Sequence, residues 1–427
     1  MKKRMLFWLV AILLLGTTSY ADTIRMMQYN LMYYTNTSGV SGCNSTTNNL
    51  NAKDVALKTI LQYVQPDVFC VNEIGSNLEY TNRILDHVLN INGVDYFAHT
   101  PLTNYSGGYI ANMLFYNTQK LAFHSATYVT TAYRDINFYK MYYRSHDLNR
   151  GDTIFMTFII AHLKAGSYEN NVTQRYMESQ QLMAKVVSMG IGNYVLSGDF
   201  NLYGANEPAY QHFIHYPNSL YNFYDPINEE GEWNNNRNYA HIHTQSTHTT
   251  SDGCFSTGGM DDRFDFILVS PYIYYGSARV QSINESYRAL GQDGNRFNGS
   301  IISPANSAVP DNIARALYNQ SDHLPVIMDF EISASTGINH QESNIWVNVI
   351  NPVSQVLKMM VQVRQEDQYL FEIYSMDGKQ IASFQQFLST GMNDLQFDFP
   401  FPASLYLLKI SNLKSALITK KIIKISN

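Results

Sequence analysis

Short apolar runs separated by polar segments recur along most of the chain. In the first three quarters they predict strands over residues 23–30, 67–71, 112–116, 136–143, 153–161, 194–196, 264–269 and 325–332. Apolar positions three and four apart predict a helix over residues 54–65, which ends at Pro66. A second predicted helix carries Val172, Tyr176, Met183 and Val187 on one face and ends at Gly190. Because strands interleave with helices, the pattern favours the α/β class with a sizeable sheet core.

The pattern changes near residue 333. Residues 333–344 are mostly polar and are typical of a linker. From residue 345 to 427 short alternating runs follow one another, over 356–363, 369–374, 380–384, 394–399, 405–410 and 417–425. Turn signals such as Asp377-Gly378 separate them, so we expect a small all-β sandwich domain after a larger domain covering residues 22–332.

The N-terminus has the features of a secretory signal peptide. A basic start at residues 1–4 precedes an apolar run over residues 5–15, and Ser19-Tyr20-Ala21 offers a small-x-small cleavage site. The apolar run is about 11 residues long, too short to span a bilayer comfortably. No later segment reaches spanning length. We therefore expect cleavage near Ala21 and a secreted or cell-surface monomer with no stable membrane span.

Composition and charge narrow the possible functions. Hydrophobic residues make up 45% of the chain and charged residues 15%, which favours a packed core and argues against disorder. A net charge of −6 disfavours a purely electrostatic nucleic-acid clamp, but a bound cation could supply the positive charge that a nuclease needs. Of the three cysteines, Cys70 lies in a buried-strand pattern, whereas Cys43 and Cys254 lie in polar loops. Whether those two pair stays open.

Polar side chains stand at the ends of the apolar strands. They are Asn30, Glu73, His162, Asp199, Asn201, Asp265, Asp322 and His323. Each of them alone has an ordinary structural explanation, such as a turn. Strand ends converge at one edge of a sheet, so these groups can meet in space although they are far apart in the sequence. The full set in this order is hard to explain by turns and indicates a catalytic site.

The set resembles the endonuclease/exonuclease/phosphatase superfamily, which includes deoxyribonuclease-I-like nucleases, bacterial sphingomyelinases and inositol-polyphosphate phosphatases. The matching stretches, within residues 23–331, are Tyr29-Asn30-Leu31, Asn72-Glu73, Ala161-His162-Leu163, Ser197-Gly198-Asp199-Phe200-Asn201, Arg263-Phe264-Asp265 and Ser321-Asp322-His323-Leu324-Pro325. The resemblance implies two packed β-sheets flanked by helices, a four-layer sandwich.

The resemblance also implies a metal site and a substrate. Glu73 would bind Mg²⁺ or Mn²⁺, with Asn30 and Asp322 lending oxygen atoms. A hard cation of this kind prefers carboxylate oxygens and neutralises the charge of a phosphodiester. Arg134 resembles a nucleic-acid-contacting arginine of the nuclease branch. The expected substrate is a phosphoester, with DNA or RNA as candidates.

The expected reaction is metal-assisted attack of water on phosphorus. Asp199, held near Asn201, would orient the water and take its proton. His323 would donate to the transition state, with Asp265 fixing its tautomer and raising its pKa. His162 resembles the second imidazole of the family, which contacts the phosphate. The identity of the general base stays open at this point.

The C-terminal segment has a resemblance of its own. Residues 351–352, 374–379, 404–409 and 420–424 resemble the sorting domain of the bacterial type IX secretion system, which implies that machinery as a partner. A segment Phe401-Pro402-Ala403-Ser404 stands where that pattern commonly has a glycine. The alternative is a carbohydrate-binding or adhesion module.

Three functions from different classes are compatible with these features. The first is a secreted nuclease or related phosphodiesterase. The second is a sphingomyelinase-like or inositol-phosphatase-like phosphoesterase, which would share the core chemistry and differ in the loops. The third is a non-catalytic surface binding protein, which is disfavoured because every expected polar position is filled.

Overall fold

The computed structural model describes residues 22–36, 42–145, 148, 153–250, 253–333, 345–363, 365–412 and 418–425. The chain divides between residues 335 and 336 into two compact units. The expected signal peptide and residues 334–344 of the expected linker lie outside the described residues. Among the helices that are described, none is both long and apolar enough to cross a membrane.

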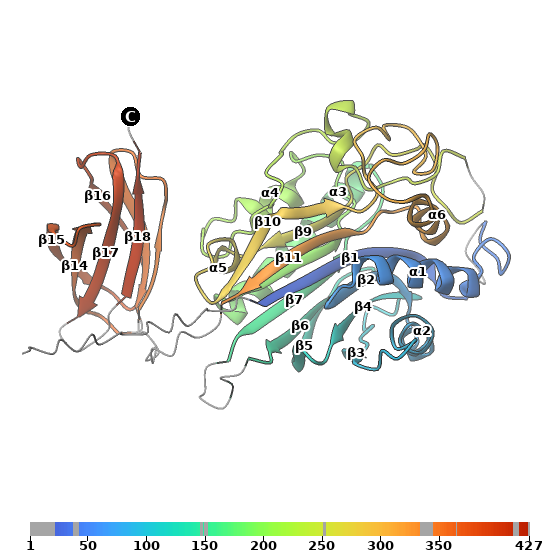
Figure 1. Ribbon diagram of the computed structural model, residues 1–427, viewed down its shortest axis with the longest axis horizontal. Coiled ribbons are helices and arrows are strands. Elements are labelled where there is room, and N and C mark those ends of the chain that lie inside the picture. Colours follow the sequence, from blue (N-terminus) through green and yellow to red (C-terminus); the bar gives the residue numbers. More distant parts are fainter. Residues whose placement is uncertain are drawn as a thin grey trace, which may run out of the picture. The chain divides into compact units, whose positions relative to one another are not determined.

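The larger unit contains two β-sheets (Figure 1). The six-stranded sheet has the order β10-β11-β1-β2-β4-β3, with β1 (Asp22–Tyr34), β2 (Val68–Gly75), β3 (Phe97–His99), β4 (Ile110–Asn117), β10 (Val280–Ala289) and β11 (Val326–Ile332). The five-stranded sheet has the order β5-β6-β7-β8-β9, with β5 (Leu121–Thr130), β6 (Asp135–Tyr143), β7 (Phe155–His162), β8 (Tyr194–Asp199) and β9 (Asp265–Val269). Within these strands β1 and β2 are parallel, as are β7 and β8, and the other pairs are antiparallel.

Alternating side chains on the strands build three apolar layers. Between the sheets, Met26 and Val68 from one sheet pack in the same core as Phe158 and Val195 from the other. The opposite face of the six-stranded sheet is covered by α1 (Leu50–Val64), α2 (Leu78–Ile84) and α6 (Asp311–Gln320). The opposite face of the five-stranded sheet is covered by α3 (Glu169–Met189) and α4 (Pro208–Ile214). The predicted four-layer α/β sandwich is confirmed.

Other helical segments among the described residues are short and include the π-helical turn Leu85–Leu89, the 3₁₀ helix Arg237–Ile242 and α5 (Pro271–Tyr274).

The two predicted helices exist, but the prediction was incomplete for one and only partly right about the buried face of the other. Helix α1 begins four residues before its predicted start, where the side chain of Asn49 accepts a hydrogen bond from the amide of Ala52. Helix α3 buries Leu182, Met183 and Val186 together with polar residues, whereas Val187 of the predicted face is exposed. The predicted apolar face therefore differs from the observed buried face, because charged residues occupy part of the buried face.

The disulfide question is answered by the structure. Cys43 and Cys254 form a disulfide between segments 211 residues apart, with their Cα atoms separated by 4.7 Å. Cys70 lies buried in β2 and forms no disulfide, as its strand pattern predicts.

The smaller unit is a two-sheet β-sandwich. One sheet has the order β12-β13-β16, with β12 (Ile345–Val349), β13 (Val356–Val363) and β16 (Gly391–Asp398). The other has the order β15-β14-β17-β18, with β14 (Asp367–Ser375), β15 (Gln380–Leu388), β17 (Ser404–Asn412) and β18 (Ile418–Lys424). Both sheets contribute to one core that includes Leu357, Phe371 and Leu408. The predicted all-β C-terminal fold is confirmed.

A buried ion pair in the larger unit generates the first testable prediction. The Arg263 guanidinium donates to both carboxylate oxygens of Asp225, at 2.7 and 2.9 Å, and both side chains are buried. Because Asp225→Ala leaves a buried charge without its partner, we expect the free energy of unfolding to fall by about 3–5 kcal/mol. The exposed pair Asp311–Arg315 provides the matched control, since Asp311→Ala should cost less than about 1 kcal/mol. Urea unfolding of the full chain measures both, and equal losses would contradict the prediction.

Candidate active site

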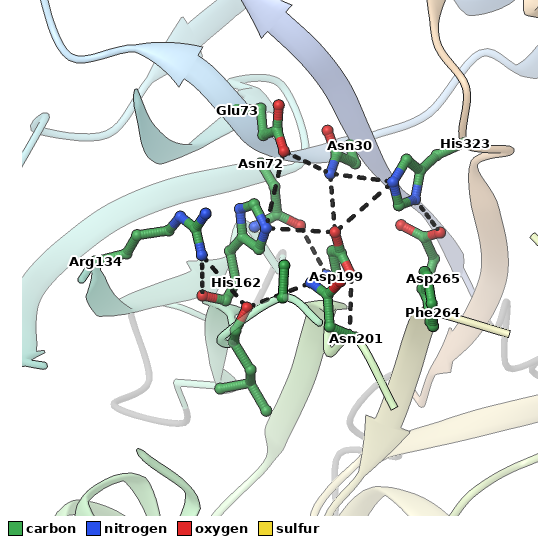
Figure 2. A network of polar contacts seen from close by, with 12 residues as sticks. Asn30, Asn72, Glu73, Arg134, His162, Asp199, Asn201, Phe264, Asp265 and His323 are labelled. Carbon is green, nitrogen blue, oxygen red and sulfur yellow. Dashed lines mark hydrogen bonds and ion pairs between the residues drawn. The ribbon is translucent and has the colours of Figure 1, made fainter. Parts of the chain in front are cut away.

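The two parallel strand pairs bring their carboxyl ends to the same edge of the sandwich. Asn30 of β1 is in register with Asn72 of β2. His162 at the end of β7 is in register with Asp199 at the end of β8, which is in register with Asp265 of β9. Figure 2 shows these side chains pointing toward one another. The topology therefore explains how residues more than 200 positions apart reach one site.

A fully buried amide joins the two sheets beneath this site. Asn72 Oδ1 accepts hydrogen bonds from Gln28 Nε2 at 2.8 Å and from the backbone amide of Asp199 at 2.9 Å. Its Nδ2 donates to Asn112 Oδ1 at 2.8 Å and to the carbonyl oxygen of Ala161 at 3.3 Å. Asn72 thus fixes the strand that carries Glu73 against the strand ends that carry the histidine and the aspartate.

The backbone around the site is unusual. Met32, Tyr33, Glu73 and Asn201 have φ values of 45°, 50°, 59° and 52°, in the left-handed region that side chains other than glycine seldom adopt. Such residues cost about 1–3 kcal/mol each and tend to gather at functional sites. Gly198 has a φ of 144°, and a Cβ atom there would lie 1.7 Å from the carbonyl oxygen of Ala161. Only glycine fits this close approach between β7 and β8.

Two carboxylates and an imidazole form a cluster that could hold a metal ion. Glu73, His162 and Asp199 each offer a ligand atom, and these atoms lie within 4.8 Å of one another. His162 Nε2 is 3.4 Å from Asp199 Oδ2 and 3.8 Å from Glu73 Oε1. The carboxylate oxygens suit Mg²⁺ or Mn²⁺, for which an imidazole is a less favoured ligand. The donor set fits a hard cation at Glu73, with His162 left available for other contacts.

This cluster differs from the expected ligand set of Asn30, Glu73 and Asp322, with which it shares only Glu73. The amide nitrogen of Asn30 faces Asp199 Oδ2 at 2.9 Å, while its oxygen accepts from the backbone amide of Met32. Asp322 Oδ2 accepts from the amide of Ser256 at 2.9 Å, and its buried Oδ1 has no hydrogen-bond partner among the described residues. As oriented, Asn30 therefore acts as a donor to the carboxylates, and one oxygen of Asp322 remains available.

Asp199 has the environment of a base that works near neutral pH. Burial, with the charges of Asp265 and Glu73 acting in the same direction, raises the pKa of Asp199 to about 7, although His323 and Asn30 oppose this. Its Oδ1 accepts from the backbone amide of Asn201 at 3.0 Å, which fixes the carboxylate. The expected neighbourhood of Asp199 and Asn201 is present, and it is made by the backbone of Asn201.

The predicted contact between Asp265 and His323 is confirmed. His323 Nδ1 lies 2.8 Å from Asp265 Oδ2, and both side chains are buried. Burial alone would lower the pKa of His323, but the negative charges of Asp265 and Asp199 outweigh it and hold that pKa well above its ordinary value. Arg263, two residues before Asp265, pairs with Asp225 and not with Asp265. Nδ1 therefore donates to Asp265, and Nε2 faces the site.

His162 and Arg134 lie together on the opposite side of the site (Figure 2). Burial, with the positive charges of Arg134 and His323, holds the pKa of His162 well below its ordinary value, so its imidazole is neutral. Arg134 donates to the carbonyl oxygen of Leu163 at 3.3 Å. Asn201 Nδ2 donates to the same oxygen, also at 3.3 Å. The structure thus brings these sequence-predicted residues to one place.

Gln245 was missed by sequence reasoning. Its side-chain amide nitrogen lies 2.7 Å from His323 Nε2 and 3.4 Å from Asp322 Oδ2. A half-turn of the Gln245 side-chain amide exchanges the positions of its nitrogen and oxygen. In that orientation the oxygen would accept a hydrogen bond from Nε2 of a protonated His323. The residue lies in a loop without apolar periodicity, so no pattern in the sequence marked it. The nearby His241 and His243 contact Glu229 and a backbone carbonyl, respectively.

No protein-family model matches the chain, and no curated protein does. Solved structures with a similar fold include the human Nocturnin catalytic domain with bound sulfate, at 14% identity over 73% of this chain and 98% of that one, with a TM-score of 0.44. An endonuclease/exonuclease/phosphatase family protein from Bacteroides thetaiotaomicron matches at 15% identity over 74% and 99%, with a TM-score of 0.45. D. rerio TDP2 complexed with a single-strand DNA product matches at 13% over 72% and 99%, with a TM-score of 0.44. With TM-scores below 0.5, these likenesses decide neither the family nor the substrate of this chain.

Proposed function

We propose that this protein is a secreted, metal-dependent phosphoesterase, and that its substrate is a phosphodiester such as DNA or RNA. The single observation that carries the proposal is the meeting of three kinds of group at one sheet edge. Glu73, a carboxylate suited to a hard cation, and the buried carboxylate Asp199 lie beside a carboxylate-supported imidazole, His323, and a neutral imidazole, His162. Hydrolysis of a phosphoester needs charge neutralisation, a base and a donor, and this set supplies all three.

Glu73 would hold Mg²⁺ or Mn²⁺, with the unpartnered oxygen of Asp322 as a further ligand. When bound, the cation would neutralise charge on the phosphate. Asp199, fixed by the amides of Asn30 and Asn201, takes a proton from the attacking water. Its burial and these two hydrogen bonds support Asp199 as the candidate for the base, a role that the sequence left open.

The two imidazoles have different tasks in this proposal. His323, kept cationic by Asp265, donates from Nε2 to oxygen atoms that gain charge in the transition state. His162 is neutral, so it contacts the phosphate through a hydrogen bond and not through charge. The guanidinium of Arg134, beside the carbonyl groups of the His162 segment, provides a positive charge for an anionic substrate.

We also propose that the protein is exported. The motif at residues 1–21 supports cleavage of a signal peptide, and the sequence of the C-terminal sandwich supports sorting by the type IX machinery. The disulfide between Cys43 and Cys254 agrees with an oxidising destination.

The first prediction of this proposal concerns the metal and the substrate. The purified protein should hydrolyse at least one member of a panel of DNA, RNA, sphingomyelin and a phosphomonoester in Mg²⁺, lose the activity in excess chelator, and regain it with Mg²⁺ or Mn²⁺. Glu73→Gln should reduce the rate by more than about 10²-fold, since loss of a supporting residue alone costs 10–100-fold. Glu79→Gln, on the exposed side of α2, is the matched control. Full activity in chelator would exclude the mechanism.

The second prediction concerns the pair Asp265 and His323. His323→Ala should lower the rate by about 10²–10⁴-fold, the usual range for a general acid or an electrostatic donor. Asp265 raises the pKa of His323, so Asp265→Asn should move the alkaline limb of the kcat/KM profile to lower pH, where the imidazolium is then lost earlier. Because the pair acts as one unit, the double variant should be little worse than His323→Ala. Additive losses in the double-mutant cycle would show that the two residues act separately.

The third prediction concerns the C-terminal unit. Deleting residues 345–427 should leave the larger unit folded and active in vitro, because each unit has its own core. The same deletion should abolish delivery to the cell surface in the native host. Circular dichroism, hydrolysis assays and cell fractionation measure these effects. A truncated protein that stays folded but loses activity in vitro would show that the sandwich does more than sorting.

A further inference from the structure

Lys53 on helix α1 is buried, with 2% of its surface exposed. Lysine is almost never fully buried unless its ammonium group is paired. Here Nζ donates to two consecutive backbone carbonyls, those of Leu31 at 2.8 Å and Met32 at 2.5 Å. The adjacent acid, Asp54, is held by Arg83 and by the hydroxyl of Tyr34. The hydrogen bonds of Lys53 in the described structure therefore go to the backbone of β1.

The segment that Lys53 binds is where β1 leaves its regular register with β2, between Asn30 and Tyr34. Met32 and Tyr33 both have positive φ there. The amide of Tyr33 donates to Glu73 Oε2 at 3.0 Å, and the amide of Met32 donates to Asn30 Oδ1 at 2.9 Å. One short segment thus presents its carbonyl groups to Lys53 and its amide groups to the residues of the site.

The two oxygens of Glu73 consequently have separate environments. Oε2 is occupied by the amide of Tyr33, while Oε1 is turned toward Asn30 Nδ2 at 3.3 Å and His162 Nε2 at 3.8 Å. A carboxylate held at one oxygen presents the other in a defined direction, which is what a cation site requires of its supporting residues.

Two carboxylates of the site act on the pKa of Lys53. Burial lowers the pKa of Lys53 to about 7, while the negative charges of Asp322 and Glu73 act in the opposite direction. The ammonium group nevertheless makes its hydrogen bonds to backbone carbonyl groups and to neither of these carboxylates.

We infer that Lys53 is a positioning residue for the cation site: it fixes the left-handed turn at Met32 and Tyr33 and thereby aims Oε1 of Glu73 into the site. The inference rests on the proposed function in one respect, that Glu73 binds a divalent cation. Its structural part, the hold of Lys53 on residues 31–33, is independent of catalysis.

The test uses the full chain with Lys53→Met, which keeps the length of the side chain and removes the ammonium group. Lys58→Met on the same helix is the matched control, and Lys53→Arg tests rescue by another donor of two hydrogen bonds. Mn²⁺ binding is measured by electron paramagnetic resonance of the free ion. Hydrogen exchange of a peptide covering residues 31–35, without metal, reports the amides of Met32 and Tyr33.

We expect Lys53→Met to weaken Mn²⁺ binding by about 10–100-fold, the usual effect of losing a residue that orients a ligand. Exchange in residues 31–35 should become faster, and Lys53→Arg should restore most of both properties. If circular dichroism shows that Lys53→Met does not fold, Lys53→Gln takes its place, since it keeps one donor group. It should show the same changes in Mn²⁺ affinity and in exchange, with smaller magnitudes.

Unchanged Mn²⁺ affinity in a folded Lys53→Met variant would overturn the inference, even if exchange became faster, because the turn would then not govern Glu73. Unchanged exchange would overturn it as well. Absence of Mn²⁺ binding in the wild-type protein would instead contradict the proposed function, and the exchange data would still decide whether Lys53 holds the turn.

Discussion

The site depends on a buried hydrogen-bond junction between the two sheets. Asn72 uses both ends of its side-chain amide. Its oxygen accepts hydrogen bonds from the Gln28 side chain and the Asp199 backbone amide. Its nitrogen donates to the Asn112 side chain and to the Ala161 carbonyl oxygen. In the dry interior such a network is strong when complete and costly when broken. Hydrogen bonds weaken steeply when distance or angle departs from the preferred range, so these four bonds tolerate little displacement. The junction therefore fixes the relative position of the two strand pairs whose ends form the site.

Burial also explains the electrostatic character of the site. Asp199, His162, Asp265 and His323 are all buried, so each charge is felt strongly by the others. The two imidazoles acquire opposite states because His323 has Asp265 as a hydrogen-bond partner, whereas burial lowers the pKa of His162 and the charges of Arg134 and His323 lower it further. In a solvent-exposed site, both histidines would have kept pKa values near the ordinary value of the imidazole. The different roles proposed for the two histidines follow from the neighbouring groups that the strand ends place beside each imidazole.

The sequence predicted the strand ends well because they combine a clear apolar run with an abrupt polar stop. It failed where polar residues form buried structure. It also missed strands β5 and β10, which are half exposed and whose apolar residues are interrupted by polar ones, so that no apolar run marked them. The buried face of α3 contains Arg175 and Glu178, which hides its period. Lys53 was overlooked since a lysine beside an aspartate on a helix is ordinarily a surface residue.

The expected ligands show a different limit of sequence reasoning. The types and the order of the residues predicted that Asn30, Glu73 and Asp322 would lie at one site. The direction of each side chain, however, is set by its contacts with the backbone. The oxygen of Asn30 is taken by the amide of Met32, and one oxygen of Asp322 by the amide of Ser256. No pattern of residue types encodes which of two oxygens a backbone amide will occupy.

The left-handed residues at 32, 33, 73 and 201 have a consequence for how this protein can change over generations. Each of them draws on the stability that the rest of the larger unit supplies. Substitutions in the distant core that lower that stability reduce what is available to hold the site in this form. Sequence change in the core and the geometry of the site at the strand ends are therefore linked. A lineage that keeps the catalytic chemistry must also keep a core stable enough to hold that geometry.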